Sequence, residues 1–171
     1  MKRWLVAGAA ALVGLTLIAI AVFSRETDEE RIRSVLARVE RAVHTDEAHA
    51  NAIMRATQLT SDFREIFAEG VTYRMPELTS ETAGRQELVA LALRASAYYG
   101  AVDLGFSDVQ IDVAESREAA TARTRAVLRA TRGGAADSQE RVVKFEFKKG
   151  GSKWAISAIA VTAKGEQGGS E

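Results

Sequence analysis

The stretch FAEGVTYRMP, residues 67–76, is the point at which the chain changes from helix to strand. Before it, apolar residues recur every three or four positions, which is the pattern of an amphipathic helix, and this pattern continues to Gly70. Residues 71–75 then alternate between apolar and polar side chains, as a strand does. Pro76 has no backbone N–H to donate to a neighbouring strand. The sequence therefore predicts a helix that ends near Gly70 and a short strand over 71–75.

Two helices are predicted upstream of this stretch. Thr27 and Glu30 have the spacing of a capping box, and the apolar residues that follow predict a helix over 28–43. After a short polar interruption, a second apolar stripe runs over 53–70 and predicts another helix, either continuous or broken near Ser61.

A third helix is predicted downstream, beginning at Arg85 in the string GRQEL. Its apolar positions keep the helical period until Gly100, which we expect to close the helix in a left-handed conformation. Beyond Gly100 the hydrophobic period changes to two, as in a strand. A phase slip in this period at residues 107–108 predicts a β-bulge. The string RGGAADS predicts a turn over 132–138. The predicted strands, an antiparallel meander, cover 104–113, 120–131, 143–148 and 153–163.

The strand over 120–131 has one small apolar face and one basic face. Alanine and threonine occupy positions where a filled core would use larger residues, so we expect a cavity between this strand and the helices. Arg123, Arg125 and Arg129 lie on the other face, where we expect them to pair with acidic residues of neighbouring strands.

An uncharged apolar run from Trp4 to Phe23 precedes the predicted domain, with Lys2 and Arg3 before it. A helix that rises about 1.5 Å per residue needs about 20 residues to cross the hydrocarbon core of a bilayer. The basic flank favours a cytoplasmic N-terminus. Residues 1–3 are therefore predicted to be cytoplasmic and 4–24 to be a signal anchor. This makes the chain a single-pass protein of a bacterial-type inner membrane, with its domain extracytoplasmic.

A cleaved secretory signal is the alternative reading of this run, because residues 19–21 read Ala-Ile-Ala, a small-x-small cleavage site. In that case the protein would be secreted. The chain contains no cysteine, which excludes disulfides, thiol chemistry and a lipid-modified N-terminal cysteine.

Residues 25–163 have the length of one domain. The formal net charge of the whole chain is +0, which does not favour nucleic acid as a partner. Residues 164–171 lack apolar side chains and contain three glycines, so we expect a disordered tail.

The order of these elements, together with FAEGVTYRMP and GRQEL, resembles the nuclear transport factor 2 superfamily, also called SnoaL-like. The resemblance covers residues 28 to 163 and includes Trp154 in the closing sheet. It implies an α+β fold in which a cone-shaped, curved antiparallel sheet wraps around about three N-terminal helices and leaves a pocket.

Two catalytic branches of that superfamily do not match this sequence. In the ketosteroid isomerase branch an aspartate general base lies just before the proline of the short strand, and here that position is Met75. A thioether cannot accept a proton at any useful pH. Members that resemble limonene epoxide hydrolase use paired aspartates bridged by an arginine, and no such set can be assigned to inward positions here. The sequence therefore indicates no catalytic residue, and an enzymatic role is uncertain.

The candidate pocket residues are aromatic or apolar, so the ligand they suit is a small apolar molecule oriented by tyrosine hydroxyls. His44 and His49 lack the spacing of two metal ligands on one helix, so no metal site and no cofactor are predicted. The candidate ligand-pocket residues are Tyr73, Met75, Tyr98, Tyr99 and Trp154.

Three functions are compatible with this sequence. The favoured one is a non-catalytic extracytoplasmic domain held at the membrane through residues 4–23, which binds a protein partner, a second copy of itself or a small apolar ligand. The second is a small isomerase, lyase or hydrolase that acts in the cone. The third is a secreted ligand carrier, released by cleavage after Ala21.

Overall fold

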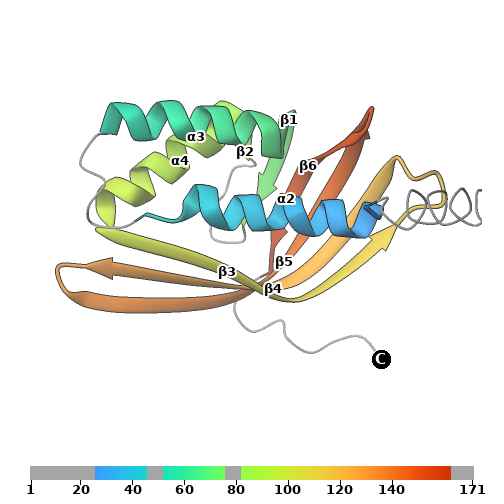
Figure 1. Ribbon diagram of the computed structural model, residues 1–171. Coiled ribbons are helices and arrows are strands. Elements are labelled where there is room, and N and C mark those ends of the chain that lie inside the picture. Colours follow the sequence, from blue (N-terminus) through green and yellow to red (C-terminus); the bar gives the residue numbers. More distant parts are fainter. Residues whose placement is uncertain (1–25, 46–51, 76–81, 163–171) are drawn as a thin grey trace, which may run out of the picture.

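A curved six-stranded sheet wraps around three helices in the computed structural model of the protein (Figure 1). The structure describes residues 26–45, 52–75 and 82–162. The elements are α2 (Asp28–Val43), α3 (Ala52–Ile66), β1 (Phe67–Arg74), β2 (Thr82–Ala83), α4 (Arg85–Tyr98), β3 (Ala101–Val113), β4 (Ala119–Arg132), β5 (Ala135–Gly150) and β6 (Lys153–Val161). This arrangement confirms the α+β fold with three helices on a curved sheet.

The sheet order is β2-β1-β6-β5-β4-β3. Strands β3 to β6 form the expected antiparallel meander, and β2 pairs antiparallel with β1. The pairing of β1 with β6 is parallel, so the expectation of a purely antiparallel sheet is wrong at this one place. Strand β6 therefore lies between β1 and β5.

The predicted anchor over 4–24 and the predicted tail over 164–171 lie outside the described residues. Within the part of the chain that the structure describes, no helix is both long enough and apolar enough to cross a membrane.

Helix α2 covers the residues predicted for it, and its N-terminal capping box is present. The Thr27 backbone N–H donates to Glu30 Oε2 at 2.7 Å, and the Glu30 N–H donates to Thr27 Oγ1 at 3.2 Å. These two bonds satisfy backbone donors that the first turn of a helix leaves free. Its buried stripe consists of Ile32, Val35, Leu36, Val39 and Ala42.

The first turn of α2 is also bonded to the β5–β6 hairpin. Asp28 Oδ1 accepts a hydrogen bond from Lys149 Nζ at 2.7 Å and another from the Trp154 indole N–H at 3.0 Å. These bonds, led by the one from Lys149, hold the pKa of the Asp28 carboxyl below its ordinary value. Trp154 itself is buried in the core.

The other end of α2 is capped by a side chain from α3. Nη2 of Arg55 donates to the carbonyl oxygens of Ala42 and His44, at 2.7 and 3.1 Å, and to Thr45 Oγ1 at 3.1 Å. Burial lowers the pKa of the Arg55 guanidinium. A cation at this position is also attracted by the negative end of the helix dipole, which stabilises the helix.

The small face of β4 is closed over most of its length rather than open to a cavity. Ala122 is fully buried and Thr124 is 2% exposed. Ala122 lies opposite Phe145 of β5, whose ring meets the ring of Phe106 edge to face at 5.4 Å between centroids. The expectation of a cavity over these residues is therefore wrong. Only Leu128, farther along the same face, is exposed.

The boundary between α3 and β1 differs from the prediction. Helix α3 is continuous through Ser61 and ends at Ile66, and the strand begins at Phe67. The helical apolar period does extend through Phe67, but this residue pairs with Ile156 of β6. A sheet partner that lies far away in the sequence therefore overrides the local pattern.

Two turn predictions are also corrected. Gly100 does not close α4 in a left-handed conformation, because its N–H donates to Thr131 O and begins the pairing of β3 with β4. The β4–β5 turn consists only of Gly133 and Gly134, both with positive φ as a two-residue type I′ turn requires, and strand β5 starts at Ala135.

The predicted bulge is confirmed, and the predicted ion pairs are confirmed for Arg125 and Arg129. The register of β3 against β4 shifts between Ser107 and Gln110, where the bulge was predicted. Cross-strand ion pairs join Arg125 to Asp108 at 3.1 Å and to Glu140 at 2.7 Å, and Arg129 to Asp103 at 3.4 Å.

We expect Asp28→Asn to lower the free energy of unfolding at pH 7 by about 2 kcal/mol, because Lys149 and the buried Trp154 lose a charged acceptor. The stabilisation by Asp28 is present above the ordinary carboxyl pKa of about 3.9 and is lost as pH falls through its lowered folded value. Urea denaturation from pH 7 down to pH 2 should show the two proteins converging at low pH. The exposed Glu29→Gln is the matched control, and an equal effect of both changes would contradict this role.

Arg55→Met should lower the free energy of unfolding by about 2 kcal/mol, because the last carbonyls of α2 lose a charged donor. Arg55→Lys should recover part of this loss, since an ammonium is charged but cannot reproduce the guanidinium geometry. Thermal unfolding followed by circular dichroism measures both. Arg64→Met, at an exposed position of the same helix, should change stability little, and a similar loss there would refute a specific cap.

Candidate functional site

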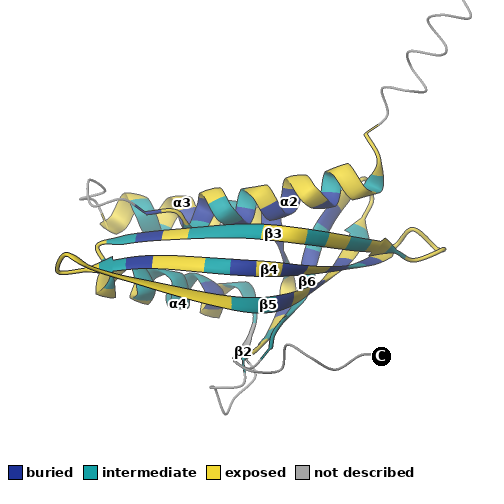
Figure 2. Cartoon of the chain, turned by 90° about the horizontal axis from the view of Figure 1, so that it is seen from below, coloured by how far each residue is buried: buried dark blue, intermediate teal, exposed yellow. Residues whose placement is uncertain are grey.

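The elements of the domain meet at two opposite ends, which can be followed in Figures 1 and 2. At one end lie the start of α2 and the β3–β4 and β5–β6 turns, which the bonds of Lys149 to Asp28 and to the Glu118 carbonyl hold together. At the other end lie the start of α3, the end of α4 and the β4–β5 turn.

Four of the five candidate pocket residues form two close pairs. The Tyr73 hydroxyl donates to Met75 Sδ at 3.3 Å, and Tyr73 is half-buried against the core. The rings of Tyr98 and Tyr99 meet edge to face at 4.9 Å between centroids, at the end of α4. Arg132 lies over the Tyr98 ring at 3.9 Å and also donates to its hydroxyl.

Trp154, the fifth candidate, does not join either pair. Its ring is 2% exposed, and its N–H is bonded to Asp28 at the end of the domain where α2 begins. The structure therefore gives Trp154 a role in fixing α2 to the sheet. A single pocket lined by all five residues remains a prediction.

Helix α4 is only partly covered by the rest of the domain. Leu88 is its one buried residue, although the helix is rich in leucine, valine and alanine. Its half-buried apolar side chains, and those of the strands that pack against the same core, are Val89, Leu91, Ala92, Leu93, Tyr73, Leu104, Phe106, Val109, Ile111, Val113, Ile159 and Val161. The apolar surface that remains partly accessible thus includes α4 and also β3, where Phe106 pairs with Ala126 and Ile111 with Ala122 of β4.

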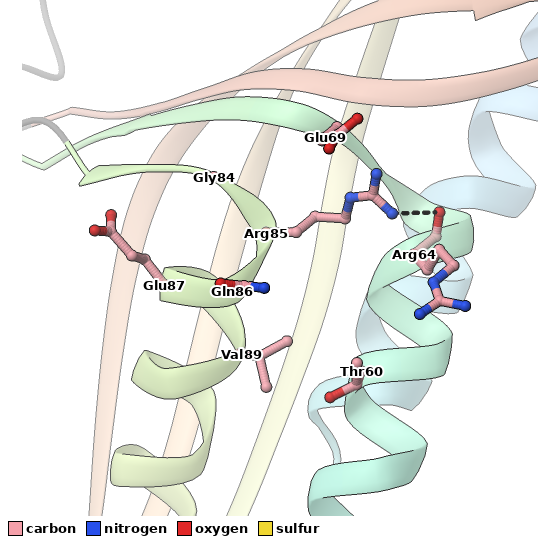
Figure 3. A pocket seen from close by; sticks show the side chains of 8 residues that line it. All are labelled: Thr60, Arg64, Glu69, Gly84, Arg85, Gln86, Glu87 and Val89. Carbon is pink, nitrogen blue, oxygen red and sulfur yellow. Dashed lines mark hydrogen bonds between the residues drawn. The ribbon is translucent and has the colours of Figure 1, made fainter.

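A polar pocket of about 760 Å³ lies between α3, β1 and the start of α4 (Figure 3). Arg64 and Arg85 approach it from the two helices, and Nη1 of Arg85 donates to the Arg64 carbonyl oxygen at 3.4 Å. Its two guanidinium groups and two carboxylates suit a polar ligand rather than an apolar one. Thr60, Arg64, Glu69, Gly84, Arg85, Gln86, Glu87 and Val89 line it.

Sequence reasoning did not find this pocket, because it depends on how α3 meets α4. The string GRQE at 84–87 marks a helix start, but nothing local indicates that Arg64 would lie across from it. Asp62, which lies two residues before Arg64 on α3, does not line this pocket; it borders a separate groove beside Arg38 of α2.

Four exposed large hydrophobic residues lie on elements that reach the end of the domain remote from the start of α2. The large hydrophobic residues that the described part of the chain exposes most are Ile53 (79%), Met54 (69%), Tyr98 (53%) and Leu128 (36%), and we call these four the distal patch. They come from the first turn of α3, the last turn of α4 and the middle of β4. Their elements meet at this end in both Figure 1 and Figure 2.

The shifted pKa values belong to groups with structural partners. Among the described residues, the pKa values of Asp28 and Arg55 are lowered, as described above. The pKa of Arg125 is raised, mainly by its hydrogen bond to Glu140. Within the same ranges no cluster of histidine, aspartate and glutamate could hold a metal ion.

Several solved structures share this fold. A nuclear transport factor 2-like protein with a cystatin-like fold from Novosphingobium aromaticivorans has a TM-score of 0.64 and 20% identity, over 90% of this chain and 92% of its own. A protein of unknown function from Mycobacterium tuberculosis has a TM-score of 0.61 and 14% identity, over 78% and 74%. A candidate aromatic ring hydroxylase from Novosphingobium aromaticivorans has a TM-score of 0.62 and 12% identity, over 78% and 87%.

The sequence comparisons identify the family. No curated protein matches the chain. The sequence profile of the SnoaL-like domain matches residues 24–160, which include every described helix and nearly all of the sheet. The resemblance noted from FAEGVTYRMP and GRQEL is thereby confirmed, and the chain belongs to the SnoaL-like domain family.

Proposed function

We propose that this protein is a membrane-anchored, non-catalytic SnoaL-like domain that lies outside the cytoplasm and binds a protein partner through its distal patch. The anchor is the apolar run over 4–23, whose length and basic flank suit a single span with a cytoplasmic N-terminus. Helix α2 begins at Asp28, a few residues after that run. The start of α2 therefore faces the bilayer, and the opposite end faces outward.

The distal patch is the observation that carries this proposal. A soluble domain usually exposes single hydrophobic residues scattered over its surface, and a cluster of them marks a surface for interaction. Here the most exposed ones come from α3, α4 and β4, whose elements meet at the end that the proposed anchor would hold away from the membrane. Methionine and tyrosine are also enriched at interfaces between proteins, as is arginine, which lies here over the Tyr98 ring.

The interior of the fold supports binding rather than catalysis. The core beneath β4 is filled by aromatic rings, with Phe145 in contact with both Phe106 and Phe147. Met75 also occupies the position at which the isomerase branch has its base, and its sulfur accepts the Tyr73 hydroxyl. Neither arrangement offers a group that exchanges protons near neutral pH.

A second candidate function is the binding of a small apolar ligand beside α4. The half-buried state of Leu91 and Leu93, with Tyr73 and Val161 on the strands, supports this candidate. Native mass spectrometry of the purified full chain, released from detergent, distinguishes the two functions. A retained small molecule that Leu91→Trp displaces would favour the ligand.

Photo-crosslinking in cells tests the partner. A benzoylphenylalanine at position 53 or 54 of the full chain should give a discrete adduct, because those positions are exposed within the distal patch. The same group at Ala37, an exposed position on the flank of α2, is the matched control. An adduct of twice the mass of the chain identifies a second copy as the partner. Equal labelling at all three positions, or none, would count against the distal patch.

Reporter fusions test the location. Alkaline phosphatase fused after Glu171 should be active and green fluorescent protein at the same place should be dark, since only the former matures outside the cytoplasm. The intact mass of the membrane-extracted chain should include residues 1–23. A mass that begins after Ala21 would instead support the secreted form, and a fluorescent green fusion would refute the topology.

A further inference from the structure

The β5–β6 turn is joined to the point at which the chain enters the domain. Lys149 Nζ bonds to Asp28 Oδ1 at 2.7 Å, and the Trp154 N–H bonds to the same oxygen at 3.0 Å. The side chains of Lys149 and Asp28 are 20% and 16% exposed, so this contact is shielded from solvent. Residues 148–153 are therefore held beside the first turn of α2.

The length of chain between the proposed span and α2 limits how far this turn can lie from the bilayer. Asp28 follows Phe23, the last residue of the apolar run, by five positions. Each residue spans at most about 3.6 Å, so Asp28 lies within roughly 18 Å of the end of the span. The polar headgroup layer begins at that end and is several ångströms thick. The β5–β6 turn consequently lies in that layer or directly above it.

The two turns at this end differ in charge. Residues 148–153 read KKGGSK, which contains three ammonium groups and no carboxylate, and Lys148 and Lys153 are exposed. Residues 114–118 of the neighbouring β3–β4 turn read AESRE, with two carboxylates and one guanidinium. Glu26 and Glu29 near the start of α2 are also exposed, and Glu26 pairs with Arg31 at 3.7 Å. The positive charge at this end is thus concentrated on the β5–β6 turn.

We propose that the β5–β6 turn, through Lys148 and Lys153, binds anionic phospholipid headgroups and so sets the orientation of the domain on the membrane. This inference rests on the proposed anchor. Basic side chains next to a span are attracted by the negative surface potential of anionic lipid, and this attraction decays within a Debye length. The carboxylates of the β3–β4 turn are repelled by the same surface. The domain therefore tilts with its β5–β6 turn toward the bilayer and its β3–β4 turn away from it.

Single cysteines in this cysteine-free chain give a direct test, because Ser152 and Ser116 are exposed at the tips of the two turns. The full chain carrying Ser152→Cys or Ser116→Cys is labelled with the same fluorophore. It is then reconstituted into vesicles of phosphatidylcholine with phosphatidylglycerol that contain a headgroup-attached nitroxide quencher. We expect a marked loss of fluorescence at position 152 and a smaller loss at position 116.

Charge and salt separate a lipid contact from mere closeness to the anchor. Lys148→Gln with Lys153→Gln should abolish the excess quenching at position 152, as should 1 M salt, which shortens the Debye length to about 3 Å. In vesicles of phosphatidylcholine alone, the excess quenching at position 152 should likewise be absent. Thermal unfolding of the double variant should be unchanged, because the Lys149 contact with Asp28 is kept.

The possible outcomes distinguish the two proposals. In a chain that floats with the vesicles, two results would overturn the lipid contact and leave the anchor intact. One is equal quenching at positions 152 and 116. The other is excess quenching at position 152 that survives the double substitution. A chain that does not float with vesicles of either composition would overturn the anchor, and the lipid contact with it.

Discussion

The closure of the small face of β4 is the constraint on which the rest of the structure depends. Ala120, Ala122 and Thr124 are at most 4% exposed, and the first two lie opposite the buried Phe147 and Phe145 of β5. Larger residues at these positions would hold the aromatic rings and α2 away from the strands, because protein interiors are filled to crystal-like density. The one polar group here, the Thr124 hydroxyl, donates to the Ser107 carbonyl oxygen at the bulge at 2.7 Å.

Charged side chains then fix α2 on this surface at both of its ends. Asp28 bonds the first turn to the β5–β6 hairpin, and Arg55 donates hydrogen bonds to the carbonyl oxygens at the end of the helix. Both groups act where a helix leaves backbone or dipole charge uncompensated. The same helix therefore connects the two ends of the domain, with its start beside the lysine-rich β5–β6 turn and its end beside the first turn of α3, which carries Ile53 and Met54.

The sequence predicted the parts of this fold that depend on local interactions. The capping box at Thr27 and Glu30 placed α2, and the phase slip at 107–108 placed the bulge, because both signals lie within a few residues. The start of β1 was missed because Phe67 fits a helical stripe and becomes a strand residue only by pairing with Ile156. Gly100 was misread for a similar reason, since its N–H bonds to Thr131.

The candidate site was less accessible to sequence reasoning. Trp154 was predicted to line a pocket because aromatic residues often do, and the sequence did not show that its indole N–H bonds to Asp28, 126 positions away. The alanines of β4 suggested space, because the sequence does not show that the phenylalanines of β5 would cover them. The distal patch was also missed, because Ile53 belongs to an apolar stripe and its exposure follows only from the position of the first turn of α3 at the edge of the core.

The position of β6 between β1 and β5 has a consequence for the order in which the domain can be assembled. Strand β1 lies early in the domain and finds its parallel partner only in β6, Lys153–Val161, the last of the described strands along the sequence. Until those residues arrive, the edges of β1 and β5 have no strand between them, and such edges invite pairing with other chains. Contacts between distant segments also form slowly. A domain of this topology therefore keeps the edges of β1 and β5 open until β6 has been made, so the final stage of its synthesis is the one at which a chaperone would be most useful.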